Sequence, residues 1–463
     1  MLALGIDIGT SGVRSAVVDA AGVPVSQARA PHVAQDPDRI DAELWWQAVE
    51  SCLVQQVAAL RDAGHDPREI GALAVDGTSG SMVLVGGGLR PVTRALMYDS
   101  AGFEAEARAI RQHAPETHIT QGANSALARL MRLQSEDRAG AARFLCHQAD
   151  FIAARLMGAA GMSDDNNALK TGFDPAARSW PDWFEALGVR MELLPHVHLP
   201  GEAFGRISES VAREFGLSPD LVVKAGTTDS IAAYLATGAR EIGTAVTSLG
   251  TTLAIKMLSP VRVDDPSIGL YSHRLGSGWL AGGASNTGGG VLRGFFSAEE
   301  LAELSARIDP DAPSGLDYYP LSRPGERFPV NDPHLAPRLS PRPEDAARFL
   351  HGMLEGIARI EARCFRALED RGAGPVRRVI SVGGGAANET WRRIRAREIG
   401  VPIETAVHEE ASVGAALLAL GAVWRGDPPR PVTPPRRRCR SSPRRPAQWR
   451  RRPGRGYRTR RRR

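Results

Sequence analysis

Two short stretches of similar composition carry the candidate chemistry of this chain. "GIDIGTSG" breaks an apolar strand at Asp7 into a turn with glycines and the hydroxyls of Thr10 and Ser11, and "TSLGTT" ends a later apolar strand at Gly250 and Thr251. Glycines let backbone amides approach an anion closely, while Thr and Ser add hydroxyl donors. Two such hairpins could hold a polyphosphate from two sides, although a polar hairpin tip also accounts for either stretch alone.

Two carboxylates at predicted strand ends suit phosphoryl transfer, which needs positioning, a metal ion and a carboxylate that orients the nucleophile. Asp7 could support magnesium, through water because this ion keeps several waters. The alternative for Asp7 is a turn-forming side chain. Asp229 in "AGTTDSIAAY" stands where a strand gives way to a helix and could accept a hydroxyl proton. The alternative for Asp229 is a helix N-cap.

Other nucleotide-binding patterns are missing from the sequence. Each of the three lysines (Lys170, Lys224 and Lys256) follows Leu, Val or Ile, so no phosphate-binding loop of the G-x-x-x-x-G-K type exists. "SVGGGAAN" is only a partial match to a dinucleotide fingerprint. If phosphate is bound, the hairpin turns must bind it. Further polar residues at turns leave open the choice between turn chemistry and a ligand-facing rim: Asp76, Thr78, Ser79, Tyr98, Asp99 and Asn124.

The first 235 or so residues alternate between predicted strands and helices. "LALGIDIG" and "SAVVDAAGVPV" read as strands, and "AELWWQAVESCLVQQVAAL" has helical spacing with Asp41 placed to cap it. "EIGALAVDGTSGSMVLV" predicts a second strand pair around a turn. Helices are expected around 103–112 and 126–156, a loop at "SDDNNALKTGFD", and then a strand at "LVVKAG" before the helix that follows.

The pattern then begins again. "GTAVTSLGTTLAIKM" repeats the opening theme, "WLAGGASNTGGGVL" resembles the second turn, and "RRVISVGGGAANETWRRIRAREIG" gives strand, glycines and helix. A duplicated α/β unit with its glycine turns facing one another would form a ligand cleft between two lobes. Residues 310–342 are rich in Pro, Asp and Gly and are expected to form a loop insertion.

Composition sets the broad class. The 463 residues contain 43% hydrophobic and 24% charged residues, which is ordinary for a globular protein of two or more domains. Four scattered cysteines argue against zinc and disulfides and favour a reducing cytoplasm. No apolar run is long enough to span a bilayer, and no secretion signal is recognisable.

The basic charge of the chain comes from one end. Residues 427–463 carry sixteen arginines and one aspartate, a net +15, so the overall +6 leaves −9 for residues 1–426. Such an apolar-poor segment cannot bury enough surface to fold. We expect a tail that is disordered or that is read out of frame from a GC-rich coding sequence. The alternative is a nucleic-acid arm that binds phosphates through counterion release.

Five stretches together resemble a known family. "GIDIGTSGVRS", "VDGTSGSMVLV", "AGTTDSIAAYLATGA", "TSLGTT" and "SVGGGAAN", in this order, are similar to the FGGY carbohydrate kinases over residues 2–425. The resemblance implies a two-lobed actin-like ATPase (ribonuclease H-like) fold. It also implies an N-terminal domain at 1–238 and a C-terminal domain at 239–426, while the tail at 427–463 falls outside the resemblance. Within the family the likeness is greatest to D-ribulokinases, a subgroup that includes plant and cyanobacterial proteins also described as xylulose kinases.

The resemblance also implies roles for particular residues. Asp229 would be the catalytic base, and Asp7 would support magnesium and catalysis. The nucleotide, ATP, would meet Thr10 and Ser11 at the first turn, Gly250, Thr251 and Thr252 at the second, and Gly384, Gly385 and Asn388 at the adenosine. The sugar pocket would contain Ser11, Gly12, Ser79, Asp99 and Asp229.

One departure from the family pattern concerns the sugar. Many members carry Trp-x-Asp-x-Arg, whereas this chain has Met97-Tyr98-Asp99-Ser100-Ala101, which counts against glycerol kinase and ordinary xylulokinase. The expected substrate is therefore D-ribulose, giving the 5-phosphate. D-xylulose, L-ribulose or a pentitol are the alternatives, and a non-catalytic sugar or nucleotide sensor is an alternative of another class. We expect a cytoplasmic monomer or homodimer without a nucleic-acid or membrane partner.

Overall fold

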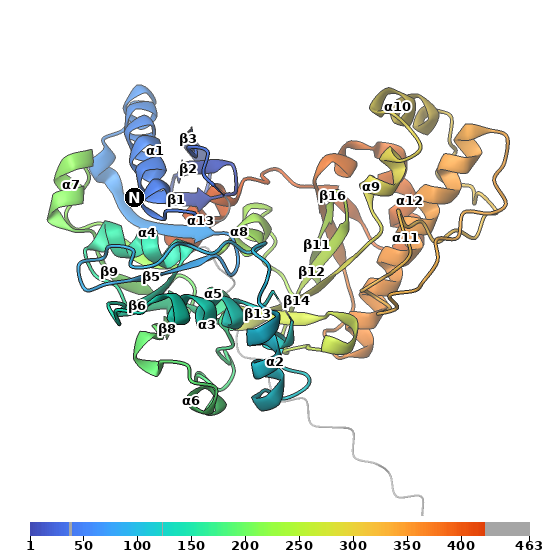
Figure 1. Ribbon diagram of the computed structural model, residues 1–463. Coiled ribbons are helices and arrows are strands. Elements are labelled where there is room, and N and C mark those ends of the chain that lie inside the picture. Colours follow the sequence, from blue (N-terminus) through green and yellow to red (C-terminus); the bar gives the residue numbers. More distant parts are fainter. Residues whose placement is uncertain (37–38, 123, 422–463) are drawn as a thin grey trace, which may run out of the picture. The chain divides into compact units, whose positions relative to one another are not determined.

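The computed structural model describes residues 1–36, 39–122 and 124–421, and these contain two six-stranded mixed sheets (Figure 1). The first sheet has the strand order β3 (Pro24–Pro31), β2 (Gly12–Val18), β1 (Leu2–Ile8), β4 (Ile70–Gly77), β10 (Val222–Thr228) and β9 (Ala203–Arg206). The second has the order β13 (Tyr271–Leu275), β14 (Gly278–Ser285), β12 (Leu253–Ser259), β11 (Thr244–Leu249), β15 (Arg378–Val382) and β16 (Ile403–Thr405).

The two sheets share one topology, which confirms the predicted duplication. In the first sheet β1 pairs antiparallel with β2 and parallel with β4. In the second sheet β11 pairs antiparallel with β12 and parallel with β15. Each glycine-hydroxyl turn therefore lies at the same place, between the central strand and its antiparallel neighbour. The expected fold class, a duplicated two-domain α/β fold, is observed.

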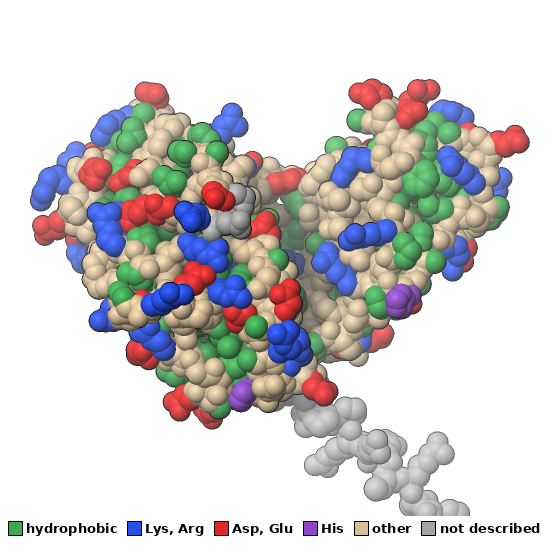
Figure 2. Space-filling model, in the orientation of Figure 1, with side chains coloured by type: hydrophobic (Ala, Val, Ile, Leu, Met, Phe, Trp, Pro, Cys, Tyr) green, Lys and Arg blue, Asp and Glu red, His purple; other side chains and the backbone are tan. Residues whose placement is uncertain are grey.

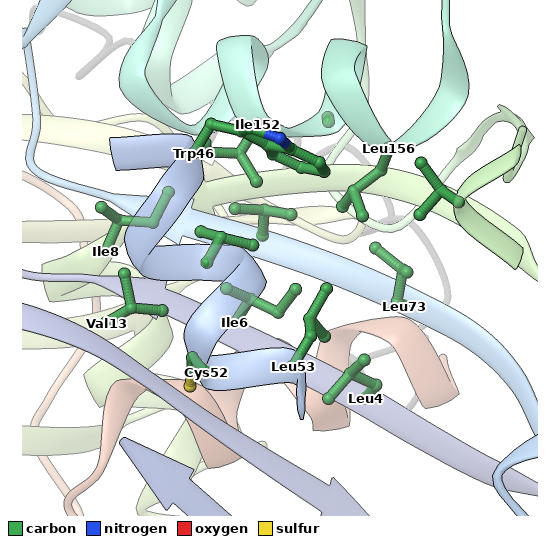
Figure 3. Close-up of a cluster of buried hydrophobic side chains, with 14 of the residues drawn as sticks. Leu4, Ile6, Ile8, Val13, Trp46, Cys52, Leu53, Leu73, Ile152 and Leu156 are labelled. Carbon is green, nitrogen blue, oxygen red and sulfur yellow. The ribbon is translucent and has the colours of Figure 1, made fainter. Parts of the chain in front are cut away.

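Helices cover the first sheet because its central strands are apolar on both faces. Every residue of β1 is buried. Leu4, Ile6 and Ile8 belong to the cluster drawn in Figure 3, where they pack with residues of α1 and α4. The helices up to residue 238 are α1 (Glu43–Asp62), α2 (Glu104–His113), α3 (Ala126–Glu136), α4 (Gln148–Met157), α5 (Asp165–Thr171), α6 (Trp183–Ala186), α7 (Glu209–Phe215) and α8 (Asp229–Ala236).

The helices after residue 238 pack against both sheets. They are α9 (Gly289–Arg293), α10 (Ala298–Ala306), α11 (Ala346–Asp370), α12 (Glu389–Ile399) and α13 (Ala411–Leu420). Helices α11 and α12 share a core with the second sheet. Helix α13, although late in the chain, packs against β1, β4 and α8. Its residues Val413 and Ala416 share a cluster with Ala3 and Ala74 of the first sheet.

Three local predictions are wrong. The strand that follows β4, β5 (Met82–Val85), pairs with β6 (Phe144–His147) and not with β4. The same strand β6 interrupts the helix expected over 126–156. The expected loop at "SDDNNALKTGFD" contains β7 (Met162–Asp164), which pairs with β8 (His196–His198), and helix α5. Asp164 caps α5 by accepting hydrogen bonds from two backbone amides. The polar composition of this stretch therefore marks the start of a helix.

Other expectations hold where the structure describes the chain. No regular helix or strand is assigned between α10 and α11, as expected for the insertion at 310–342. Cys52, Cys146 and Cys364 are buried free thiols, and the described helices include none that is long and apolar enough to cross a membrane. Acidic and basic side chains intermingle on the face drawn in Figure 2. The predicted disordered tail at 427–463, with Cys439, lies outside the described residues.

Candidate active site

Two aspartates lie side by side at the ends of parallel strands. Asp7 of β1 is in register with Asp76 of β4, and both are buried. Neither oxygen of Asp76 has a hydrogen-bond donor from the chain. Burial, followed by the negative charges of Asp7 and Asp229, raises the pKa of Asp76 well above its ordinary value. Burial also raises the pKa of Asp7, although hydrogen bonding to Asp76 and the charge of Arg14 oppose this shift.

Asp229 follows the next strand of the same sheet. It is the first residue of α8, and the N-cap of that helix is Thr228, so the alternative of an N-cap for Asp229 is not what the structure has. One carboxylate oxygen of Asp229 accepts a hydrogen bond from the Ser230 amide at 2.6 Å. Burial raises the pKa of Asp229, while this hydrogen bond and the ammonium groups of Lys256 and Lys170 favour the ionised form.

The first hairpin turn opens onto a cavity. The Gly9 amide donates to the Gly12 carbonyl at 3.0 Å, which closes the turn and leaves Thr10 and Ser11 exposed at its tip. A Cβ at Gly12 would lie 2.4 Å from the Ala30 carbonyl oxygen, so only glycine fits there. Thr10, Ser11 and Asp99 line one cavity of about 490 Å³. The structure thus brings two predicted phosphate-turn residues and one predicted sugar-pocket residue together.

The remaining predicted sugar-pocket residues are not in the lining of that cavity. Gly12 is buried at the start of β2, Asp229 follows β10, and the Ser79 hydroxyl is buried without a hydrogen-bond partner. The loops that carry Ser79 and Asp99 are held by Arg129, a buried guanidinium on α3. Its side chain donates to the carbonyl of Gly80 at 3.0 Å and to the carbonyl of Tyr98.

The second hairpin turn lines a larger cavity of about 770 Å³. Its lining includes Gly250, Thr251, Gly384, Gly385 and Asn388, all predicted to meet the nucleotide, but not Thr252. Apolar residues complete the wall, among them Leu292, Leu301, Ala302 and Trp391. A cavity lined by both glycine backbone and apolar side chains suits a group that is part phosphate and part planar ring.

Backbone contacts fix the second turn in place. The Gly289 amide donates to the Gly250 carbonyl at 2.9 Å, and the Gly290 amide donates to the Thr251 carbonyl at 3.0 Å. A Cβ at Gly288 would lie 2.6 Å from the Thr252 carbonyl carbon, so this glycine permits the close approach. The glycine run "TGGG" therefore packs against the second hairpin turn.

The residues near Asp7 fit a magnesium ion. A hard cation takes oxygen ligands, and magnesium in kinases is held by one or two carboxylates together with substrate phosphates. Asp7 and Asp76 supply such a pair of carboxyl groups on neighbouring strands. In the described residues no three His, Cys, Asp or Glu side chains group closely enough to hold a metal by themselves. An ion here would therefore share its ligands with phosphate and water.

Two family models match this chain, one over the part that contains the first sheet and one over the part that contains the second. The N-terminal domain model of the FGGY family of carbohydrate kinases matches residues 2–236, and the C-terminal domain model matches residues 245–423. The chain belongs to the FGGY family of carbohydrate kinases. Full-length relatives agree with this assignment. A xylulose kinase from Streptomyces rubiginosus is 27% identical over 92% of this chain and 89% of its own length. A gluconokinase from Bacillus subtilis is 23% identical over 92% and 88%.

Solved structures share the fold. A xylulose kinase from Rhodospirillum rubrum superposes with a TM-score of 0.79 at 22% identity, covering 91% of this chain and 90% of that one. These relatives bear the names xylulose kinase and gluconokinase, so the expected subgroup of D-ribulokinases is not supported by them. The family of carbohydrate kinases is established, and the choice of sugar is a separate matter.

Two features of this FGGY kinase site are not predicted from the sequence. The sequence predicts only a turn or rim position for Asp76, although Asp7 of β1 is followed by Ile-Gly-Thr-Ser-Gly and Asp76 of β4 by Gly-Thr-Ser-Gly. That repeated ending was a usable signal for two carboxylates on neighbouring strands. Lys170 lies far from the glycine motifs in the sequence and Lys256 follows the second hairpin turn by four residues, so only the fold brings both close to Asp229.

Proposed function

We propose that this chain transfers the γ-phosphoryl group of ATP to the terminal hydroxyl of a ketopentose, and that D-xylulose is its preferred substrate. The cavity lined by Thr10, Ser11 and Asp99 carries the proposal, because it joins phosphate-binding hydroxyls to a polar residue of the sugar pocket. The relative named xylulose kinase, which matches nearly the whole chain, supports D-xylulose.

In the proposed reaction the terminal sugar oxygen bonds to the γ-phosphorus as the bond from phosphorus to the bridging oxygen of ADP breaks. The hydroxyl proton passes to Asp229, and the electron pair of the broken bond remains on ADP. The hydroxyls of Thr10 and Ser11 and the backbone of Gly250 and Thr251 hold the phosphates. Asp7 and Asp76 would hold magnesium, which when bound neutralises charge on the phosphate oxygens.

A second substrate, D-ribulose, is favoured by one observation. Met97, Asp99 and Ala101 line the cavity at the positions where many family members carry the Trp, Asp and Arg of Trp-x-Asp-x-Arg. Loss of the large ring and of the guanidinium changes both the shape and the hydrogen-bond donors of the pocket wall. A pocket that differs in these groups can distinguish sugars that differ in one hydroxyl orientation.

The substrate proposal is tested by ADP release from the full chain with magnesium and ATP. D-xylulose, D-ribulose, L-ribulose, ribitol, gluconate and glycerol would be compared by kcat/KM. A clear preference for D-xylulose supports the proposal, and preference for D-ribulose makes the second substrate the correct one. ATP binding without turnover on any of these sugars would contradict the kinase mechanism and favour a sugar or nucleotide sensor.

The role of Asp229 is tested by Asp229→Asn, which keeps the shape but cannot accept the proton. We expect kcat to fall by at least about 100-fold, the usual contribution of a general base, with ATP binding retained in calorimetry. Asp220→Asn is the matched control, because that exposed aspartate near the start of β10 forms only a surface ion pair with Arg206. Activity of Asp229→Asn close to that of the control would rule out the assigned role.

A further inference from the structure

A cavity next to Asp229 combines cationic and neutral polar side chains with glycine and apolar residues. It has a volume of about 280 Å³, and its lining includes Ser230, Lys256, Tyr271, His273 and Arg327 but no Asp or Glu. Lys256 lies on β12, the strand that begins directly after the second hairpin turn. Ala254 and Lys256 line the cavity, while Leu253, Ile255 and Met257 belong to the apolar core of the second sheet, from which Ile255 also reaches the cavity wall.

Lys256 reaches the residue that follows the proposed base. Its ammonium group donates to the Ser230 carbonyl at 2.9 Å. Lys170, at the end of α5, donates to the Tyr271 hydroxyl at 2.8 Å and lies 4.1 Å from the centre of the tyrosine ring. In the described part of the chain neither lysine forms an ion pair with a carboxylate, although the charge of Asp229 acts on Lys256. Two cations thus converge without a direct anionic partner.

Lysine is rare in this chain, so two lysines close to Asp229 are unexpected. The chain contains three lysines among 58 basic residues, so arginine serves at nearly every other cationic position. Lysine offers a compact charge on a flexible stem that can follow a moving group, whereas arginine presents a fixed fork. Two of the three lysines influence Asp229.

His273 adds an unused hydrogen-bonding group to the same cavity. It is buried, and its Nε2 atom has no hydrogen-bond partner. Burial, with the neighbouring charges of Lys170 and Lys256, lowers the pKa of His273 well below its ordinary value, so the ring stays neutral. Polar atoms this deeply buried are almost always paired, which indicates that a ligand completes the site.

We propose that Lys256, supported by Lys170, contacts the transferred phosphoryl group and is a catalytic residue of this kinase. The inference rests on the proposed function, because it uses Asp229 as the base. The reacting phosphorus must lie beside the hydroxyl oxygen that Asp229 deprotonates, within reach of a lysine held one residue away. As Asp229 takes the proton it loses its charge, while charge on the phosphoryl oxygens must still be balanced. Lys256 balances it at that moment.

Substitutions separate this role from a structural one. Lys256→Met removes the charge, and we expect kcat to fall by about 100-fold or more, as when one transition-state donor is lost, with the KM for the sugar little changed. Lys256→Arg keeps the charge and should recover part of kcat. The matched control is Lys224→Met. It removes the third lysine of the chain, which lies on β10, the strand that leads to Asp229, and it should retain wild-type kcat. A Lys256→Met enzyme with normal kcat, or with only a lower Tm, overturns the proposal.

A binding readout does not depend on turnover or on the identity of the sugar. The full chain would be treated with an amine-acetylating reagent, with and without inorganic phosphate, and modification at the three lysines measured by mass spectrometry. Burial lowers the pKa of Lys256 to about 7, against the opposing charge of Asp229, so its amine reacts readily at neutral pH. Phosphate should protect Lys256 and leave Lys224 unchanged. Equal labelling of Lys256 with and without phosphate contradicts the proposal, even where the sugar panel has identified a substrate. Protection without sugar turnover would leave the site correct and the substrate proposal wrong.

Discussion

Asp7 and Asp76 place two carboxyl groups in register on neighbouring parallel strands, where both cannot be ionised without cost. The raised pKa of Asp76 means that the folded chain keeps its proton at pH values where the unfolded chain has lost it. Stability from this group is therefore greatest at low pH. It is lost as pH rises from the ordinary aspartate pKa of 3.8 toward the folded value.

Asp76→Asn should therefore raise the Tm of the metal-free chain at pH 8 by more than at pH 5, because the asparagine has no charge to bury. Thermal unfolding followed by circular dichroism at both pH values measures this. Asp62→Asn on the exposed end of α1 is the control and should give the same small change at both. A Tm that falls equally at both pH values would mean that Asp76 makes contacts that asparagine cannot replace.

At this same scale the sequence located the two hairpin turns more completely than the surroundings of the proposed sugar pocket. Turns made of glycine and hydroxyl residues are local, so Thr10, Ser11, Gly250 and Thr251 could be located from their neighbours in the sequence. The surroundings of Ser79 and Asp99 depend on Arg129, which is 30 or more residues away and holds backbone carbonyls in both loops. No local pattern encodes such a contact.

Among the secondary-structure elements, the wrong pairing predicted for β5 has a tertiary cause. Strand β5 follows a turn much like the first one, yet Thr78 bonds to Gln148 at the start of α4, and β5 pairs with the strand before that helix. The partner of a strand is a tertiary choice, whereas the strand itself follows from its apolar residues. Asp41 gives a milder case, because it lies one residue before the N-cap of α1 but still accepts a hydrogen bond from the Glu43 amide.

The contact between α8 and α13 depends on a single small residue. A Cβ added at Gly414 of α13 would lie 1.7 Å from the Ala232 carbonyl oxygen of α8. Gly414→Ala should force the helices apart and destabilise the chain by about 2 kcal/mol or more, seen as a lower Tm in calorimetry. Gly88→Ala, at an exposed loop position where the new Cβ meets nothing within 4 Å, is the control. Equal Tm values for the two variants would disprove the close packing.

On the scale of the whole molecule, the C-terminal half of the chain contributes a helix to the core of the first sheet. Helix α13 packs on the first sheet, and one apolar cluster contains Ala3 and Ala74 of that sheet, Ile231 of α8 and Val413 of α13. The order of motifs predicts the duplication but not this exchange, because α13 is simply an apolar helix near the end of the sequence.

A fragment of residues 1–238 should therefore fail to unfold cooperatively and should aggregate, since it leaves the α13 side of its sheet uncovered. The same fragment joined through a Gly/Ser linker to residues 409–421 should recover a cooperative transition in urea. Analytical ultracentrifugation and denaturation of both fragments make the comparison. A soluble, cooperative 1–238 fragment would mean that the α13 contact is dispensable.

The late position of α13 also orders events during synthesis. The ribosome delivers β1 within the first ten residues, but the helix that covers one side of it only after about four hundred more. Domains generally fold as they emerge, with the N-terminal one first. In this kinase the domain that is made first is the last to be finished, so the nascent chain must keep an apolar sheet face from aggregating until translation is nearly complete. Its dependence on chaperones should accordingly be set by the speed of translating the second half, and not by the stability of the first.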